Sequence, residues 1–257
     1  MKLLEIINLS KSFGGLNAVD QVNMELIRGE ILGLIGPNGA GKTTLFNLIT
    51  GFIRPNKGRI KFRGEDITGL KANEVAAKGI VRTFQASNTL FQQRMVWENV
   101  LIASHLKYRS GLLRTFINTP FIGAEENNIK NQALELIDSI GLSTVQNEYA
   151  VNLPHGYQRL LGVCLALAAN PTILLLDEPV TGLTPEETSA FMNYIVKLRD
   201  NGLTILLVEH NMKAVMNTCD RIVVLNYGKK IAEGSPDLIS KNEDVIKAYL
   251  GVDINVT

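Results

Sequence analysis

A chain of 257 residues can bury a substantial core and is close to the upper limit for one domain. Its 26 basic and 25 acidic side chains nearly cancel, which excludes a strong electrostatic attraction to nucleic acid or anionic lipid. No apolar run approaches the roughly 18 residues that span a bilayer, and the first residues lack the cleavage site of a signal peptide, so we expect a soluble chain.

Residues 3–60 have the pattern of short strands joined by turns. The runs Leu3–Leu9 and Val22–Leu26 predict two strands, and Ser12–Gly15 predicts a turn between them. Phe13 is an unusual residue for a turn, where it would act either as a core plug or as a stacking platform for a nucleotide base. The apolar run Ile31–Ile35 then predicts a buried strand.

The stretch after this strand carries the clearest chemical signal. It fits GxxxxGK[ST], and a helical pattern beginning at Leu45 completes the strand–loop–helix context of a phosphate-binding loop. Its glycines allow tight turning, so backbone N–H groups and the helix N-terminus converge on a phosphate. Lys42 would reach the β- and γ-phosphates, and Thr43 would ligate Mg²⁺. The predicted nucleotide-contacting residues are Gly36, Pro37, Asn38, Gly39, Ala40, Gly41, Lys42, Thr43 and Thr44.

The middle of the chain changes from strands to helices. Little strand signal occurs between Ser87 and about Asn152, which predicts a helical subdomain inserted between parts of a sheet domain. The predicted elements are the helix Asn73–Lys78, the strand Ile80–Phe84, and the helices Trp97–Tyr108 and Glu125–Ile140, the last two joined by a stretch that contains Gly111, Pro120 and Gly123.

The last hundred residues alternate between helices and strands. This alternation predicts a mostly parallel α/β sheet. The predicted elements are helix Gly156–Ala169, strand Thr172–Leu176, helix Pro185–Leu198, strand Thr204–Val208, helix Asn211–Asn217, strand Arg221–Leu225, a turn at Asn226–Lys229, strand Lys230–Glu233 and helices after Gly234.

Polar side chains at the ends of these strands are the candidate catalytic groups. Asp177 suits the outer shell of the Mg²⁺ bound at Thr43, and Glu178 would orient and deprotonate an attacking water. Gln85, which ends its own strand, would bind Mg²⁺ or water through its amide oxygen. A histidine at a strand end is more often structural, but His210 follows the next strand after Asp177, which favours a catalytic role.

In chain order these features resemble the ATP-binding subunit of an ATP-binding cassette (ABC) transporter. The resemblance extends over almost the whole chain. Val81–Gln85, Trp97–Val100 and Gly111–Gly123 further resemble the branched-chain amino-acid importer branch of that family. The matching motifs are the aromatic A-loop position at Phe13, Walker A at Gly36–Thr44, the Q-loop at Gln85, the signature region at Leu153–Gln158, Walker B at Asp177–Glu178, the D-loop at Thr181–Thr184 and the switch histidine at His210.

The resemblance implies one ABC ATPase domain over residues 1–257, with an α/β P-loop NTPase core and a mostly parallel sheet. Its parts would be an antiparallel β region with the Walker A core (1–86), a helical subdomain with the signature region (about 87–170) and a Walker B core with C-terminal helices (about 171–257). The implied cofactors are ATP, with Phe13 at its base, and Mg²⁺, with Thr43, Gln85 and Asp177 as ligands.

The resemblance also implies partners and a location. The partners would be a second ATP-binding subunit, identical or a sister chain, integral-membrane permease subunits and, indirectly, a solute-binding protein, with no nucleic acid. The chain would be cytoplasmic and peripheral on the inner face of the cell membrane. It would hydrolyse ATP to energise uptake of a small solute, branched-chain amino acids by the branch resemblance.

The signature region departs from the family pattern LSGGQ. In the family, the serine hydroxyl and the amides at a helix start contact the γ-phosphate of ATP held by the partner subunit. Pro154 has neither a hydroxyl nor an N–H, although proline is accepted in a first helical turn. We therefore expect fewer contacts to the partner's ATP, and Thr184 likewise replaces the usual Asp or Asn of the D-loop. The matching residues are Leu153, Pro154, His155, Gly156, Tyr157 and Gln158.

Two other functions are compatible with a phosphate loop. A soluble ABC ATPase of DNA repair or translation would carry coiled coils or a duplicated head, whereas this chain has one head and no long heptad insert. A small-molecule kinase would leave Gln85, His210 and the signature region unused. Co-purification with a permease, binding to DNA or ribosomes, or phosphorylation of an acceptor distinguishes the three functions.

Overall fold

The computed structural model describes residues 1–83, 91–107 and 120–250, and the chain divides into two compact units. The first unit comprises Met1–Arg82, Thr172–Glu178 and Met192–Thr257. The second comprises Thr83–Pro171 and Pro179–Phe191. The predicted residues Phe84 and Gln85 lie outside the described residues.

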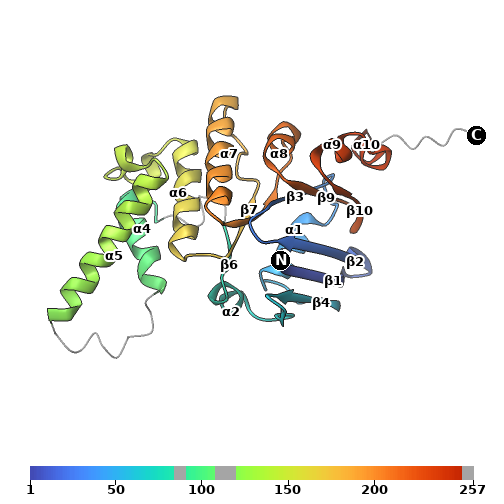
Figure 1. The fold of residues 1–257 in the computed structure, drawn as a ribbon, viewed down its shortest axis with the longest axis horizontal. Helices are drawn as coiled ribbons and strands as arrows, with labels where there is room; N and C mark the ends of the chain where they lie inside the picture. The colour runs from blue at the N-terminus through green and yellow to red at the C-terminus, as the bar shows by residue number, and fades with distance from the viewer. Residues whose placement is uncertain (84–90, 108–119, 251–257) are drawn as a thin grey trace, which may run out of the picture. The chain divides into compact units, whose positions relative to one another are not determined.

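The first unit contains a four-stranded antiparallel sheet in the order β2-β1-β4-β5 (Figure 1). Its first hairpin turns at Gly14 and Gly15, whose φ angles of 50° and 89° suit a two-residue turn that continues both strands. The predicted turn at Ser12–Gly15 was therefore wrong by two residues, because the strand continues through Phe13. The strands are β1 (Lys2–Phe13), β2 (Leu16–Ile27), β4 (Lys57–Phe62) and β5 (Glu65–Asp66).

The same unit contains a six-stranded sheet in the order β10-β9-β3-β8-β7-β6. All neighbouring strands are parallel except β9 and β10, which confirms the predicted mostly parallel sheet. Because parallel strands end at one edge, the residues that follow β3, β7 and β8 emerge together. The strands are β3 (Ile31–Ile35), β6 (Ile80–Arg82), β7 (Ile173–Asp177), β8 (Thr204–Val208), β9 (Arg221–Asn226) and β10 (Lys229–Gly234).

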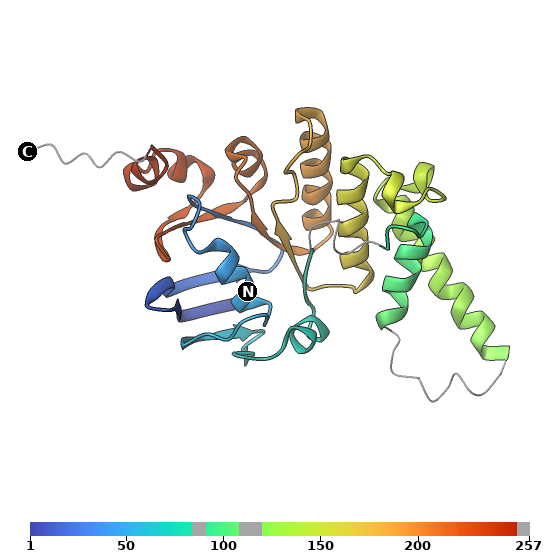
Figure 2. The same ribbon diagram turned by 180° about the vertical axis from the view of Figure 1, so that it is seen from behind.

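Helix α1 lies between the two sheets (Figures 1 and 2) and contributes to an apolar cluster that contains side chains from both. Phe46 and Leu45 of this helix are fully buried in a cluster that also contains side chains from both sheets. Burying this much apolar surface is the main stabilising contribution in such a unit. The helices of the unit are α1 (Lys42–Ile49), α2 (Ala72–Ala77), the part of α7 (Pro185–Asp200) from Met192 onward, α8 (Met212–Thr218), α9 (Pro236–Ser240) and α10 (Glu243–Leu250).

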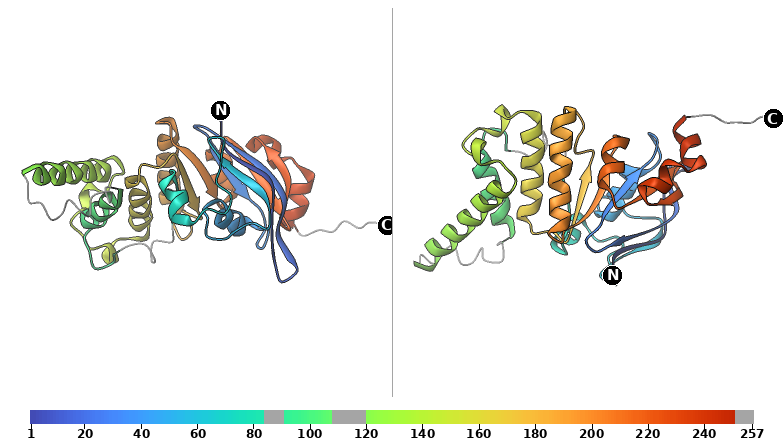
Figure 3. Two further views of the ribbon diagram at one scale, coloured as in Figure 1. Left: turned by 90° about the horizontal axis from the view of Figure 1, so that it is seen from below. Right: turned by 45° about the horizontal axis from the view of Figure 1, so that its top comes forward.

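The second unit is helical (Figure 3). Helix α4 packs against both α5 and α6, with Val100, Ile137 and Leu161 fully buried. Helix α5 begins at Pro120, which the sequence placed in the preceding connection; proline suits a first helical position because its fixed φ is helical and its missing N–H would be unpaired there. The elements are α4 (Val96–Lys107), α5 (Pro120–Ser139), α6 (His155–Ala168), the short 3₁₀ turns η2 (Ser143–Val145) and η3 (Ala150–Asn152), and the start of α7 (Pro185–Asp200).

None of the helices in the described residues is both long enough and apolar enough to span a lipid bilayer.

Candidate nucleotide-binding site

The loop between β3 and α1 has the backbone shape of a phosphate cradle. Gly36 has a φ of 151° and Gly41, which precedes α1, has a φ of 101°. A Cβ atom at Gly36 would lie 2.1 Å from the Leu225 carbonyl oxygen, and one at Gly41 would lie 2.2 Å from that of Ala18. Both positions therefore require glycine for conformation and for space, as the sequence motif predicts.

Lys42 is held inside this loop. Its side chain is buried, and its Nζ donates hydrogen bonds to the Gly36 carbonyl at 2.7 Å and the Pro37 carbonyl at 2.9 Å. Burial lowers the pKa of Lys42, while the negative charges of Glu178 and Asp177 raise it. The ammonium group is thus already positioned in the loop and lies within the field of the two acids after β7.

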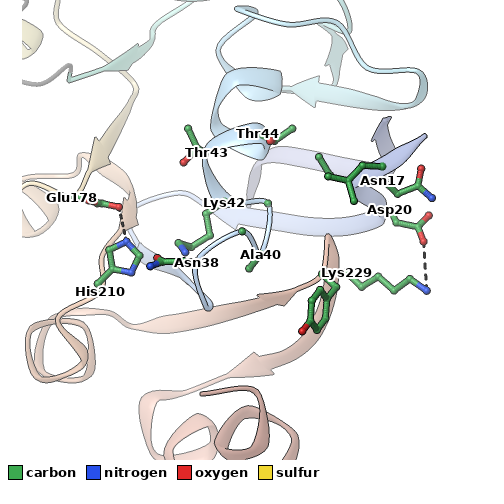
Figure 4. Close-up of a pocket in the computed structure, with 15 residues that line it drawn as sticks. Asn17, Asp20, Asn38, Ala40, Lys42, Thr43, Thr44, Glu178, His210 and Lys229 are labelled. Carbon is green, nitrogen blue, oxygen red and sulfur yellow. Dashed lines mark hydrogen bonds and ion pairs between the residues drawn. The ribbon is translucent and has the colours of Figure 1, made fainter. Parts of the chain in front are cut away.

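A cavity of about 530 Å³ opens in front of the loop (Figure 4). Asn38, Lys42 and Thr43 lie on one side of it, with Glu178 and His210 beyond them, as Figure 4 shows. This volume is ample for a nucleotide. The cavity is lined from the loop by Asn38, Gly39, Ala40, Gly41, Lys42, Thr43 and Thr44, and from other elements by Leu16, Asn17, Ala18, Asp20, Glu178, His210, Tyr227 and Lys229.

Glu178 and His210 form a close pair at the edge of this cavity. His210 Nε2 lies 2.5 Å from Glu178 Oε1, and both side chains are about two-fifths exposed. Glu178 has a left-handed φ of 48°, which an ordinary residue adopts only at a cost, and its N–H donates to the Val208 carbonyl at 2.9 Å. The sequence alone does not reveal this pairing, because it indicates only that both residues follow strands.

The backbone that carries His210 is fixed by the residues next to it. The buried Glu209 carboxylate accepts hydrogen bonds from the N–H groups of His210 at 3.0 Å and Asn211 at 3.4 Å. The Asn211 side chain caps α8 by accepting from the Ala214 N–H at 3.1 Å. These bonds place His210 between the end of β8 and the start of α8.

Asp177, the last residue of β7, makes an ion pair with Arg82. Arg82 Nη2 lies 2.5 Å from Asp177 Oδ2, and Arg82 Nη1 donates to Asn47 Oδ1 at 2.6 Å. The two charged side chains are only 11% and 22% exposed. The sequence did not indicate this pair, because Arg82 and Asp177 are 95 positions apart.

The donor set fits a magnesium ion that is shared with a nucleotide. In the part of the chain that the structure describes, no group of three or more His, Cys, Asp or Glu side chains could hold a metal. Mg²⁺ that binds with nucleotide phosphates needs only one or two protein oxygens. Thr43 lines the cavity, and Asp177, which is not among the lining residues, has a carboxylate close enough to Lys42 to affect the pKa of the lysine. Both are hard oxygen donors of the required kind.

Phe13 lies apart from the cavity lining. It is the last residue of β1, its side chain is 49% exposed, and the Lys11 Nζ lies 5.1 Å from its ring centroid. The core-plug alternative is therefore wrong. The stacking alternative stays a prediction, because Phe13 is not among the residues that line the cavity, whereas Leu16 and the aromatic Tyr227 are.

The residues of the signature region lie at the start of α6 in the second unit. Pro154 is the N-cap of that helix, which begins at His155, one residue before the predicted start at Gly156. Serine at this position would cap the helix, whereas no side chain caps α6 here. Leu153 is buried, and its carbonyl accepts a hydrogen bond from Gln158 Nε2 at 3.0 Å. The helix start is therefore formed without a capping hydroxyl.

Thr184 has a clear local role at the start of α7. Its Oγ1 accepts from the Glu187 N–H at 3.2 Å, and the Glu187 carboxylate accepts from the Thr184 N–H at 2.9 Å. This reciprocal pair is a capping box. Threonine thus supplies the same helix cap that Asp or Asn would supply.

Comparisons with known proteins identify the family. A family model for ABC transporters matches residues 19–181, and a model for branched-chain amino acid ATP-binding cassette transporters matches residues 229–254. The Escherichia coli high-affinity branched-chain amino acid transport ATP-binding protein LivG is 44% identical over 97% of this chain and 98% of its own length.

Two solved ATP-binding cassettes are similar over most of this chain. The ADP conformation of the ATP-binding cassette MJ1267 matches with a TM-score of 0.85 and 31% identity, covering 98% of this chain and all of the other. The dimeric, post-hydrolysis cassette MJ0796, bound to ADP and Pi, matches with a TM-score of 0.75 and 25% identity over 91% of this chain and 99% of its own. With a phosphate loop, a paired glutamate and histidine beside it, and these matches over nearly its full length, the chain belongs to the ABC transporter family of nucleotide-binding ATPases.

Proposed function

We propose that this chain is the ATP-hydrolysing subunit of an ABC importer that takes up a small solute, namely branched-chain amino acids. The single observation that carries the ATPase part is that Lys42, Thr43 and the Glu178–His210 pair line one cavity. The solute follows from the likeness to LivG over 97% of the chain and from the match at residues 229–254. Its size and near-zero charge, without a coiled-coil insert, argue against a DNA-repair or translation ATPase.

The residues around the cavity have different roles in ATP hydrolysis. Backbone N–H groups of Gly36–Thr44 bind phosphate oxygens, and Lys42 leaves the Gly36 and Pro37 carbonyls to bind the β- and γ-phosphates. Glu178 accepts the proton of the attacking water, while His210 holds its other carboxylate oxygen in place. Thr43 and Asp177, with Gln85 as a further ligand, would hold Mg²⁺, and the ion would supply positive charge to balance the phosphates when it is bound.

The proposed assembly contains a second ATP-binding subunit and membrane-embedded permease subunits, with a solute-binding protein as an indirect partner. Residues Leu153–Gln158 would then contact the ATP of the second subunit, as the dimeric form of MJ0796 supports. The chain itself would be cytoplasmic and bound to the inner face of the membrane through the permease. Residues 1–257 would form one ABC ATPase domain with the three parts named above.

The test of this function is to isolate the chain from its native membranes in detergent. We expect a hydrophobic permease to co-purify, and reconstituted vesicles to take up leucine, isoleucine or valine only when ATP is present on the side of this chain. Uptake of a chemically different solute would contradict the solute assignment alone. Recovery with DNA or ribosomes and no permease would contradict the importer.

Replacing Pro154 by serine is expected to strengthen ATP-driven dimerisation and to raise the ATPase rate of the assembled transporter. Serine would supply a cap for α6 and a hydroxyl for the partner's γ-phosphate, and one hydrogen bond to a charged group is worth about 1.5–3 kcal/mol. The gain in dimer affinity would therefore be at least about tenfold. Pro236→Ser, which also changes a proline at a helix start, is the matched control and should change neither quantity. No gain in the Pro154 variant would show that this region already acts at full strength.

A further inference from the structure

Arg82 links three parts of the nucleotide site that are distant in the sequence. It ends β6, the edge strand that pairs with β7, so its guanidinium group reaches the end of β7. One nitrogen pairs with the Asp177 carboxylate at 2.5 Å, and another donates to Asn47 on α1 at 2.6 Å. The guanidinium carbon also lies 5.6 Å from the Phe46 ring centroid. Such a planar fork is fixed more firmly than a lysine would be.

The ion pair places the positive guanidinium group of Arg82 beside the Asp177 carboxylate, which is proposed to help hold Mg²⁺. Asp177 is 22% exposed and Arg82 is 11% exposed, so water screens the two charges only partly. A carboxylate in this position would be costly to hold without a counter-charge. Arg82 therefore supplies the charge balance at Asp177 when no metal ion is present.

We propose that Arg82 is a positioning residue whose charge sets how tightly Mg²⁺ is held beside Asp177. The inference rests on the proposed assignment of Asp177 to Mg²⁺. Mg²⁺ and the Arg82 guanidinium group would share the Asp177 carboxylate. Arg82 therefore lowers the affinity of the site for Mg²⁺, because two positive charges repel each other, while it keeps the carboxylate in position. The arrangement stabilises the metal-free site and eases release of the metal with the spent nucleotide.

The anchor on α1 gives this pair a fixed position. Asn47 is one helical turn beyond Thr43, and the Phe46 ring is fully buried in the core of the first unit. The carboxylate of Asp177 is thereby tied, through one arginine, to the helix that carries the phosphate loop. Loss of the charge should change metal binding, whereas loss of the fork alone should change mainly the stability of the fold.

The experiment uses two variants that separate charge from geometry. Arg82→Gln keeps an amide donor but has no charge, and Arg82→Lys keeps the charge but has no fork. The measured quantity is a ratio for the non-hydrolysable analogue AMP-PNP: its dissociation constant in EDTA divided by its dissociation constant in excess Mg²⁺. A larger ratio means that Mg²⁺ contributes more to binding. We expect Arg82→Gln to raise this ratio about tenfold, which equals about 1.4 kcal/mol, and Arg82→Lys to leave it as in the wild type.

Three further variants complete the test. Arg221→Gln removes another partly buried arginine of the first unit, paired with Glu30 and Glu233, and should lower the unfolding temperature without changing the ratio. Asp177→Asn should lower the ratio. If Asp177→Asn has no effect, the metal assignment fails; if it lowers the ratio but Arg82→Gln leaves it unchanged or lowers it, the role of Arg82 is overturned. Arg82→Met, which fills the space beside Phe46 without a polar group, repeats the comparison if Arg82→Gln does not fold.

Discussion

The variant Glu178→Gln is expected to bind ATP as well as the wild type but to turn it over about 10²–10⁴ times more slowly, the usual contribution of a general base. Glutamine keeps the size of the side chain and can still hydrogen-bond to His210 Nε2, which lies 2.5 Å from the carboxylate. It cannot accept the proton of the attacking water. Because the ATP-bound state then persists, ATP should also hold two subunits together as a stable dimer.

The measurement combines steady-state phosphate release with nucleotide binding and with the mass of the complex in the presence of ATP. Glu65→Gln is the matched control, because the Glu65 carboxylate also has one close side-chain partner, Lys78 Nζ at 2.7 Å, but does not line the cavity. Its turnover should equal that of the wild type. Wild-type turnover in Glu178→Gln would remove Glu178 as the base, and a loss of ATP binding would mean that the substitution disrupts the cavity.

The variant Gly41→Ala is expected to lose nucleotide binding, and its free energy of unfolding should fall by about 2–5 kcal/mol. Left-handed backbone costs a non-glycine residue about 1–2 kcal/mol, and overpacking costs about 1–3 kcal/mol more. The overlap arises because the new Cβ would lie 2.2 Å from the Ala18 carbonyl oxygen, a backbone atom of β2 that cannot rotate away. The loop would have to move, and its N–H groups would no longer converge.

Gly202→Ala separates backbone strain from this collision. Gly202 has a φ of 92°, close to the 101° of Gly41, but a Cβ there would meet no atom within 4 Å. Gly202 does not line the cavity. Denaturant unfolding without nucleotide should therefore show a loss of only about 1–2 kcal/mol, with ATP affinity unchanged. Equal losses in the two variants would contradict the claim that space at Gly41, and not conformation alone, requires glycine.

The sequence was sufficient where a property is local. The phosphate loop is nine adjacent residues, and its glycines, lysine and flanking strand could be recognised without knowledge of distant parts. The mostly parallel sheet followed from the alternation of strands and helices. The hairpin at Gly14–Gly15 was misplaced because a glycine pair can end a turn or form the whole of it, and the pattern of the neighbouring residues did not distinguish the two.

Contacts between distant strands could not be predicted in this way. Asn17, Asp20 and Lys229 line the cavity, and Lys229 makes an ion pair with Asp20 at 3.5 Å, yet no motif surrounds any of them. In the sequence, Arg82 stands out only as part of a run that resembles a family branch. Its pairing with Asp177 depends on which strands are neighbours in the sheet, and strand order is not encoded in local periodicity.

The support of the phosphate loop also bears on how the chain is made. The loop is complete by Thr44, but its Ala40 carbonyl accepts a hydrogen bond from the N–H of Gly228 at 3.0 Å, and β3 has β8 and β9 as its two neighbours. All three partners leave the ribosome long after the loop has emerged. During most of synthesis β3 therefore lacks both neighbouring strands, and its apolar residues stay exposed. This favours slow folding and protection by chaperones. The most local motif of the sequence is among the last parts of the molecule to be completed.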